Sequence, residues 1–212
     1  MYKELKELFD SFKCNIYQLD ECIIPIELIA SKRDEINRTS HGLIIGRILS
    51  MLNDQLILSL CKLYDKPSNN YPTVSIFSIP EYLNSNGGDF DEQELIDRSV
   101  VFFSNKKSLE IIEDSFVKSI YSLYNKEIDD RSEILENFKY RRDKIIAHNE
   151  LIDPYEYKEI YWIQAMELKG LTDEFRECID YSIFNNSGSG YISDLSSVKE
   201  SMKTLLETIL EE

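Results

Sequence analysis

The stretch RRDKIIAHNE, residues 141–150, places two arginines, an aspartate and a histidine within ten residues. A histidine titrates near neutral pH and can move a proton to or from a ribose hydroxyl or a leaving oxygen. An arginine fork can stabilise the negative phosphate of a transition state. His148 together with Arg141 or Arg142 is therefore suited to cleaving RNA without a metal ion.

The choice between the two arginines depends on the local geometry. On a continuous α-helix, Arg141 and His148 share a face, whereas Arg142 and His148 are offset by roughly 120° around the axis. This geometry favours Arg141. A histidine near a helix end can sit in a distorted turn where the offset changes, so the spacing leaves both arginines as candidates.

One histidine and one arginine make a small active site. A symmetric dimer that brought two copies of this helix together would supply separate acid and base groups from two histidines, with two arginines beside them. The ordinary alternative is helix capping. Arginine and histidine in the last turns of a helix interact favourably with its negative end, and NELIDP after the motif is typical of a helix exit.

The densest basic and aromatic cluster of the chain surrounds this motif. Lys139, Arg141 and Lys144 could contact RNA phosphates, and Phe138 and Tyr140 could stack on bases. The alternative is a solvated helix face backed by core aromatics, and we favour this alternative for the two aromatic residues. The sequence thus predicts RNA binding by the three cationic side chains.

Apolar residues at helical spacing predict that helices must position this motif. A first helix is expected over 1–32 and a second, apolar nearly all round and therefore central, in the stretch that ends at Pro67. Residues 67–93 predict a loop with a short helix at 78–83. Helical spacing resumes at about Glu94, a turn is expected at 125–133, and later helices are expected up to 184 and over 197–210.

This pattern predicts an all-α fold, an up-and-down helical bundle of four or five main helices plus short helices. We divide the chain into a bundle over 1–184, a flexible connector over 185–195, which contains NNSGSG, and an amphipathic C-terminal helix over 196–212 that packs on the bundle or on a partner.

Composition and net charge argue against several other classes of function. The net charge of -15 argues against a broad phosphate-binding face, so any RNA contact must be local. We see no apolar signal core at the N-terminus and no uncharged stretch of about 18 apolar residues, which predicts a cytoplasmic protein without a membrane partner. Four cysteines without a C-x-x-C pair and two histidines predict no metal site, no cofactor and buried reduced thiols.

RRDKIIAHNE resembles the R-x4-6-H motif of the HEPN superfamily, in which an arginine is followed by a polar residue, a short apolar stretch and a histidine. Arg142, Asp143, KIIA and His148 match in that order. Upstream, LILSLCKLYDKPSNNYPTVSI is similar to the segment before the motif in the abortive-infection AbiU-like branch, where a long helix ends in a leucine-rich stretch, an aspartate and a loop leading to a short helix. The resemblance covers about residues 45–152.

The resemblance implies a helical bundle that forms a homodimer, with the motif helices meeting across the interface. Proteins of this type are typically metal-independent endoribonucleases used in phage defence or as toxins of toxin–antitoxin pairs. Carried over, His148 would be the general acid/base, Arg142 the phosphate-binding group, and Asp143 the residue that orients them. In HEPN toxins paired with nucleotidyltransferase antitoxins, a tyrosine two residues after the histidine is modified; here that position is Glu150.

Three classes of function follow. The first is a dimeric HEPN ribonuclease acting on RNA, with a cognate antitoxin or another defence protein as a further partner. The second is a non-catalytic HEPN-fold module that binds RNA, nucleotide or protein. The third is a helical scaffold whose acidic surface binds a basic partner. A dimer with Arg142 and His148 around one cleft would favour the first two.

Overall fold

The computed structural model describes residues 2–67, 74–86, 91–103, 115–147, 162–185 and 195–211. Of these residues, 87% are helical and none lies in a strand, which confirms the predicted all-α fold. In chain order the elements are α1 (Tyr2–Ser31), α2 (Arg33–Ile36), α3 (Gly42–Tyr64), α4 (Ser78–Asn86), α5 (Glu92–Phe103), α6 (Phe116–Asp129), α7 (Ser132–Arg141), the π-helical segment η2 (Arg142–Ala147), α8 (Trp162–Ser182) and α9 (Ser196–Glu211).

The predicted helices are found close to their expected positions. The turn expected at 125–133 falls at Asp130 and Arg131, and the short helix expected at 78–83 is α4, which continues to Asn86. Most of the connector expected over 185–195 lies outside the described residues. The division into a bundle and a C-terminal helix stays a prediction.

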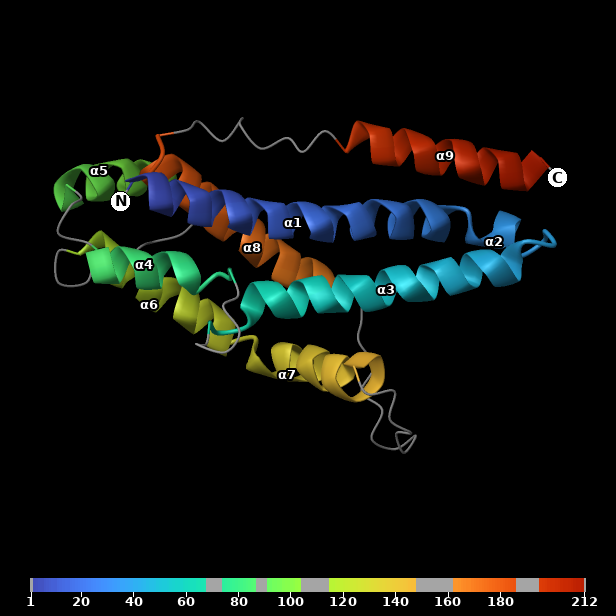
Figure 1. Ribbon diagram of the computed structural model, residues 1–212, viewed down its shortest axis with the longest axis horizontal. Coiled ribbons are helices and arrows are strands. Elements are labelled where there is room, and N and C mark those ends of the chain that lie inside the picture. Colours follow the sequence, from blue (N-terminus) through green and yellow to red (C-terminus); the bar gives the residue numbers. More distant parts are fainter. Residues whose placement is uncertain are drawn as a thin grey trace.

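Two long helices, α1 and α3, run antiparallel side by side and form the spine of the fold (Figure 1). At one end of this pair, α8 packs on both helices and on α5, while α4 and α6 pack against each other, α4 also touching α1 and α6 touching α5. The apolar positions of α1 at steps of three and four residues, Leu5, Phe9, Phe12, Ile16 and Leu19, are all fully buried in this main core.

Aromatic side chains connect α1 to the helices that cover it. Phe9 stacks on Phe184 with ring centroids 5.0 Å apart, and Phe12 meets Phe175 edge-to-face at 5.6 Å. Tyr124 of α6 contacts the same Phe175 at 4.8 Å. Edge-to-face pairs contribute beyond the area that they bury, so this cluster fixes α6 and α8 on the spine.

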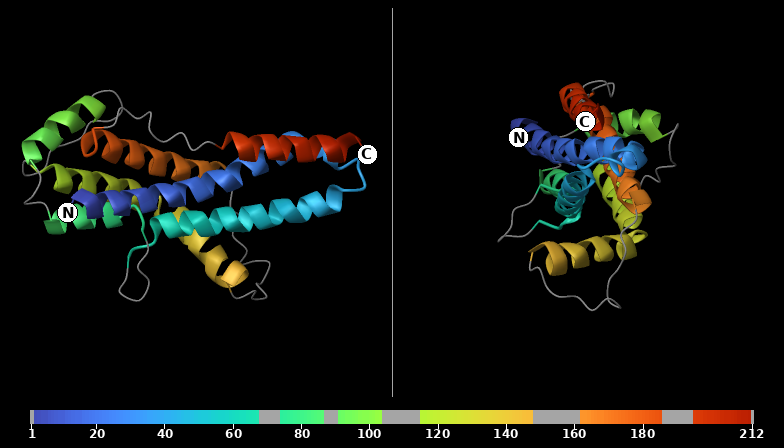
Figure 2. Two further views of the ribbon diagram at one scale, coloured as in Figure 1. Left: turned by 45° about the horizontal axis from the view of Figure 1, so that its top comes forward. Right: turned by 90° about the vertical axis from the view of Figure 1, so that its right-hand side faces the viewer.

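At the opposite end of the spine, α9 lies along α1 (Figure 2). Leu206 of α9 is buried with Ile29, Ile36 and Ile45 in a second apolar cluster, separate from the main core. The N-terminal half of α3 runs along α1, and its Ile45 is part of this small cluster. We call this end of the molecule the distal tip.

The prediction that α3 is a central helix is wrong for its N-terminal half. Leu43, Ile44 and Met51 are 74%, 59% and 71% exposed, because α3 extends past the helices that cover its other half. By length and hydropathy, α3 also passes a test for membrane-spanning helices, with a mean hydropathy of 1.4 over its most apolar window, of which 28% is buried. Core helices of water-soluble proteins pass the same test, so the result does not place the chain in a membrane.

The expectation of buried thiols holds for three of the four cysteines. Cys22, Cys61 and Cys178 are buried and free, whereas Cys14 is exposed. Cys14 lies on the outer side of α1, between the buried positions Phe12 and Ile16, so the helical period turns it toward solvent.

Candidate active site

The motif lies where α7 changes into the π-helical segment η2. After the turn at Asp130 and Arg131, α7 runs to Arg141, and η2 begins at Arg142. Phe138, only 1% exposed, holds α7 on the main core, and Ile146 packs at the core's edge. Single π-helical turns inside longer helices occur frequently at functional sites.

The change of helix type removes the basis of the helical-wheel preference for Arg141. That preference assumed 3.6 residues per turn through the whole motif, whereas Arg142–Ala147 has the wider π-helical turn. His148 lies outside the described residues, as does Glu150. The position of His148 relative to either arginine therefore stays a prediction.

Arg142 is held by two carboxylates. Its Nη1 donates to Oδ2 of Asp65 at 2.6 Å, and its Nε donates to Oδ1 of Asp143 at 2.7 Å. The Arg142 side chain is 24% exposed. The hydrogen bond to Asp143, with the nearby charge of Asp65, raises the pKa of the guanidinium above its ordinary value, so Arg142 stays cationic.

Asp65 is a site residue that the sequence reasoning did not assign. It is the C-cap of α3, with an extended backbone, and it turns back toward η2. The side chain of Lys139 also comes within 3.9 Å of its second oxygen. The only signal in the sequence was the aspartate at the end of the leucine-rich stretch, and its contact with Arg142 depends on tertiary packing.

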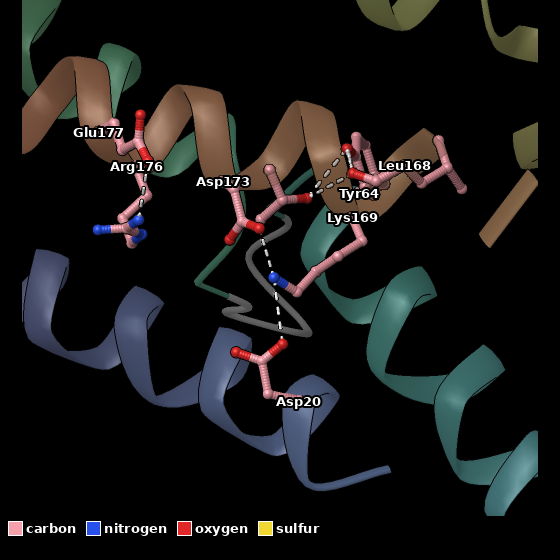
Figure 3. A network of polar contacts seen from close by, with 8 residues as sticks. Asp20, Tyr64, Leu168, Lys169, Asp173, Arg176 and Glu177 are labelled. Atoms are coloured by element: carbon pink, nitrogen blue, oxygen red, sulfur yellow. Dashed lines mark hydrogen bonds and ion pairs between the residues drawn. The ribbon is translucent and has the colours of Figure 1, made fainter. Parts of the chain in front are cut away.

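The end of α3 that presents Asp65 is anchored to α8. The hydroxyl of Tyr64, one residue before Asp65, donates to the carbonyl oxygen of Leu168 at 2.6 Å and accepts from Thr172 at 3.0 Å (Figure 3). Tyr64 is 1% exposed, and burial raises the pKa of its hydroxyl above the ordinary value. The hydroxyl therefore stays protonated, and it fixes the position of the neighbouring carboxylate.

Arg141 points to a different part of α3. Its Nη2 lies 3.5 Å from Oδ1 of Asp54, eleven residues before Asp65 and thus about 16 Å away along the helix. The two adjacent arginines are therefore divided between two separate carboxylates of α3. Asp54, like Asp65, had not been assigned a role from the sequence.

The cations expected to bind RNA differ in their accessibility. The Lys139 side chain is 40% exposed and Lys144 is exposed, while the Arg141 side chain is only 20% exposed. Asp143 is exposed and accepts a hydrogen bond from Arg142, and its expected role of orienting Arg142 and His148 stays a prediction. Phe138 is a core residue, as favoured from the sequence. The structure thus brings Arg142 and Asp143 together with Asp65 and Lys139.

Two further groups of ionisable side chains lie outside the motif. Burial raises the pKa of the Cys61 thiol to about 12, so Cys61 is a neutral core residue beneath Arg142. Between α8 and α1, Lys169 of α8 lies 3.1 Å from Asp20 and also pairs with Asp173 (Figure 3). Within the described part of the chain, no three histidine, cysteine or acidic side chains come together to hold a metal ion.

The comparison with protein families agrees with the resemblance seen in the motif. The family model described as AbiU2, a HEPN family, matches residues 2–184, which extends the likeness from the motif region to the whole bundle before α9. No curated protein and no solved structure matches the chain. Because the match covers most of the sequence, this chain belongs to the AbiU2 family of abortive-infection HEPN domains.

Proposed function

We propose that this protein is a metal-independent endoribonuclease of the HEPN type, acting in phage defence or as a toxin, with a composite active site at a homodimer interface. Arg142 carries the proposal. It is the arginine of the motif, it stays cationic, and two carboxylates orient its guanidinium. An arginine fork held in this way is prepared to bind a phosphate with its remaining donors.

The reaction follows from the two side chains of the motif. The 2′-hydroxyl of a ribose attacks the adjacent phosphorus while His148 takes its proton, and a bond forms between the 2′-oxygen and phosphorus. The bond from phosphorus to the 5′-oxygen breaks, and a second histidine, His148 of the partner subunit, protonates the leaving oxygen. Arg142 stabilises the charge that develops on the non-bridging oxygens. The products are a 2′,3′-cyclic phosphate end and a 5′-hydroxyl end.

The other cations have a supporting role in this proposal. Lys139 and Lys144 are exposed beside Arg142 and would hold neighbouring phosphates, and Arg141 would join them on release from Asp54. Because the chain is acidic overall, this small basic area would hold only a short RNA segment. A cognate antitoxin or another defence protein would control the activity.

The test is RNA cleavage by the purified protein in EDTA, on total cellular RNA and tRNA. We expect the wild type to cut and leave cyclic phosphate ends, and His148→Ala to lose the activity without loss of helical circular dichroism. His41→Ala is the matched control, since His41 is the only other histidine. Cleavage that requires added magnesium, or that persists in His148→Ala, would contradict the proposal.

A specific observation also favours a second function. Both motif arginines are already paired with carboxylates, and Arg141 is mostly covered. This arrangement is what a non-catalytic HEPN module would show, in which the arginines tie η2 to α3 and the domain binds RNA, nucleotide or another defence protein. RNA binding without cleavage, unaffected by His148→Ala, would support this second function.

A further inference from the structure

The distal tip carries the arginines that this chain leaves without a carboxylate. Five of the eight arginines are paired with aspartate or glutamate side chains: Arg98, Arg131, Arg141, Arg142 and Arg176. Within the described part of the chain, Arg33, Arg38 and Arg47 have no such partner, and all three are exposed. Because the chain has 39 acidic residues, three arginines without one are available to an anion from another molecule.

The segment around these arginines carries little negative charge. From 36 to 53 the sequence has no aspartate or glutamate, the longest such run in the chain. Residues 28–53 have four cationic and two acidic side chains, a net charge of +2, whereas the whole chain carries -15. The next carboxylate of α3, Asp54, lies about 16 Å along the helix from Leu43, roughly twice the Debye length at physiological salt. The tip can therefore approach an anionic surface that would repel the rest of the chain.

Exposed aliphatic side chains lie beside Arg47. Leu43 and Ile44, in the first turn of α3, are 74% and 59% exposed. Arg47 follows Leu43 by four residues and Ile44 by three, so the three side chains share one side of the helix. The acidic helix α9 lies on the other side of α1 from α3 (Figures 1 and 2). The exposed side of α3 at the tip is thus both apolar and cationic.

A groove at the distal tip combines the same two properties. It has a volume of about 460 Å³ between α1, α2 and α3, and Ile29, Ile36 and Ile45 are part of its apolar lining. Arg33 and Gly46 line it too. A β-carbon added at Gly46 would meet no atom within 4 Å, so the groove has open space on that side. Aliphatic walls with a cation suit a molecule that has a hydrocarbon chain and an anionic head group.

A lipid surface fits these observations better than RNA or a protein. Single-stranded RNA is held in part by stacking on aromatic rings, and residues 28–53 contain no Phe, Tyr or Trp. A protein partner needs a complementary shape, whereas Leu43 and Ile44 project from the far end of the long α1–α3 pair (Figure 1). A fluid bilayer closes around projecting aliphatic side chains, and its anionic head groups attract arginines.

We propose that the distal tip docks on the surface of an anionic phospholipid membrane. Leu43 and Ile44 enter the interface between head groups and acyl chains, and Arg33, Arg38 and Arg47 bind lipid phosphates. A few aliphatic side chains or a few cations alone bind weakly, so stable attachment takes both. Docking on one face of a membrane requires neither a signal core nor a spanning helix, the two features on which the expectation of no membrane partner rested. The inference goes beyond the proposed function and uses none of its residues.

The test is flotation of the full chain with vesicles of phosphatidylglycerol and phosphatidylcholine in equal parts. We expect the wild type to float with these vesicles, less so at high salt, and not with phosphatidylcholine alone. Arg47→Gln should weaken binding about fivefold, and Leu43→Ser at least as much. Arg98→Gln on α5, at the opposite end of the spine, and Ile163→Ser on α8, at a position 75% exposed, are the matched controls and should bind as the wild type does.

A fluorescent label tests which residues enter the lipid. In a Cys14→Ser background, which removes the exposed thiol, Leu43→Cys carries a polarity-sensitive nitrobenzoxadiazole group. Its emission should rise and shift to the blue when phosphatidylglycerol vesicles are added. The same label on Ile163→Cys should not respond. The label on Met51→Cys should respond less than the label on Leu43→Cys, because Met51 lies two turns farther from the tip.

The outcomes of these tests are independent of RNA cleavage. His148→Ala should float as the wild type does, even where it cuts no RNA. Wild-type protein that does not float with anionic vesicles, or Arg47→Gln that floats no worse than Arg98→Gln, would overturn the proposal. A Leu43→Cys label that is already shielded from water without vesicles, in a chain that sediments as a dimer, would show that a second copy covers the tip and would overturn it as well.

Discussion

Replacing Asp65 by asparagine tests whether this carboxylate positions Arg142. The contact is 2.6 Å long, and the side chains of Arg142 and Asp65 are 24% and 30% exposed, so solvent screens it only in part. A hydrogen bond to a charged group contributes about 1.5–3 kcal/mol to stability. Asparagine keeps an acceptor oxygen, and Asp143 still holds the Nε of Arg142, so we expect a loss of about 1 kcal/mol, or a fall in Tm of about 2–4 °C.

The effect on catalysis should be larger than the effect on folding. If Asp65 fixes the direction of the Arg142 guanidinium, loss of the Asp65 carboxylate leaves the guanidinium mobile. The guanidinium must then be ordered again in each turnover. A cost of about 1.4 kcal/mol in the transition state corresponds to a tenfold fall in rate. Because Asp65 is not expected to contact RNA, we expect kcat to fall about tenfold with KM nearly unchanged.

The assay is steady-state cleavage of a fluorescent RNA in EDTA, with Tm measured in parallel. Asp65→Glu keeps the charge and should recover part of the lost kcat, which a purely structural role would not predict. Asp34→Asn is the control, since Asp34 is an exposed aspartate on α2. A variant Asp65→Asn that cleaves as fast as the wild type or faster would refute the positioning role, and faster cleavage would show that Asp65 competes with the substrate phosphate.

Two further perturbations test the packing around the site and at the distal tip. Iodoacetamide at pH 8 should modify Cys14 in the folded protein but spare Cys61, because Cys61 is buried and the pKa of its thiol is raised to about 12. Mass spectrometry of the peptides checks this expectation. Alkylation of Cys61 in the folded protein would contradict the described core. Leu206→Ala should lower the free energy of unfolding, measured in urea, by about 2–3 kcal/mol, because Leu206 is 4% exposed. Leu205→Ala is the control and should lower it much less, because Leu205 is 44% exposed. Equal losses would show that α9 does not pack as described.

The sequence was sufficient for the helices because their signals are local. The three- and four-residue steps of α1 and the prolines around α4 predicted both elements, and the spacing from Ser197 to Leu210 predicted α9. The resemblance identified the family from a short motif, which the match over residues 2–184 confirms.

The sequence was insufficient where tertiary packing decides. The apolar circumference of α3 predicted a central helix, but the pattern did not show that the covering helices reach only half of its length. The helical wheel assumed α geometry through the motif, and η2 is π-helical. Asp54 and Asp65 are ordinary surface residues by sequence, and only the approach of α7 to α3 gives each of them an arginine.

The position of α9 has a consequence for the order of folding. The spine can form as soon as α3 has been synthesised, because α1 and α3 are neighbours in sequence. Leu206 of α9 packs on Ile29, Ile36 and Ile45. Because α9 is the last helix in the chain, the rest of the bundle is synthesised before these three residues are covered. Throughout that interval the nascent chain shows an apolar surface, which is the kind of surface that chaperones bind. A ribosome-bound chain halted before α9 should therefore recruit a chaperone that the finished protein releases.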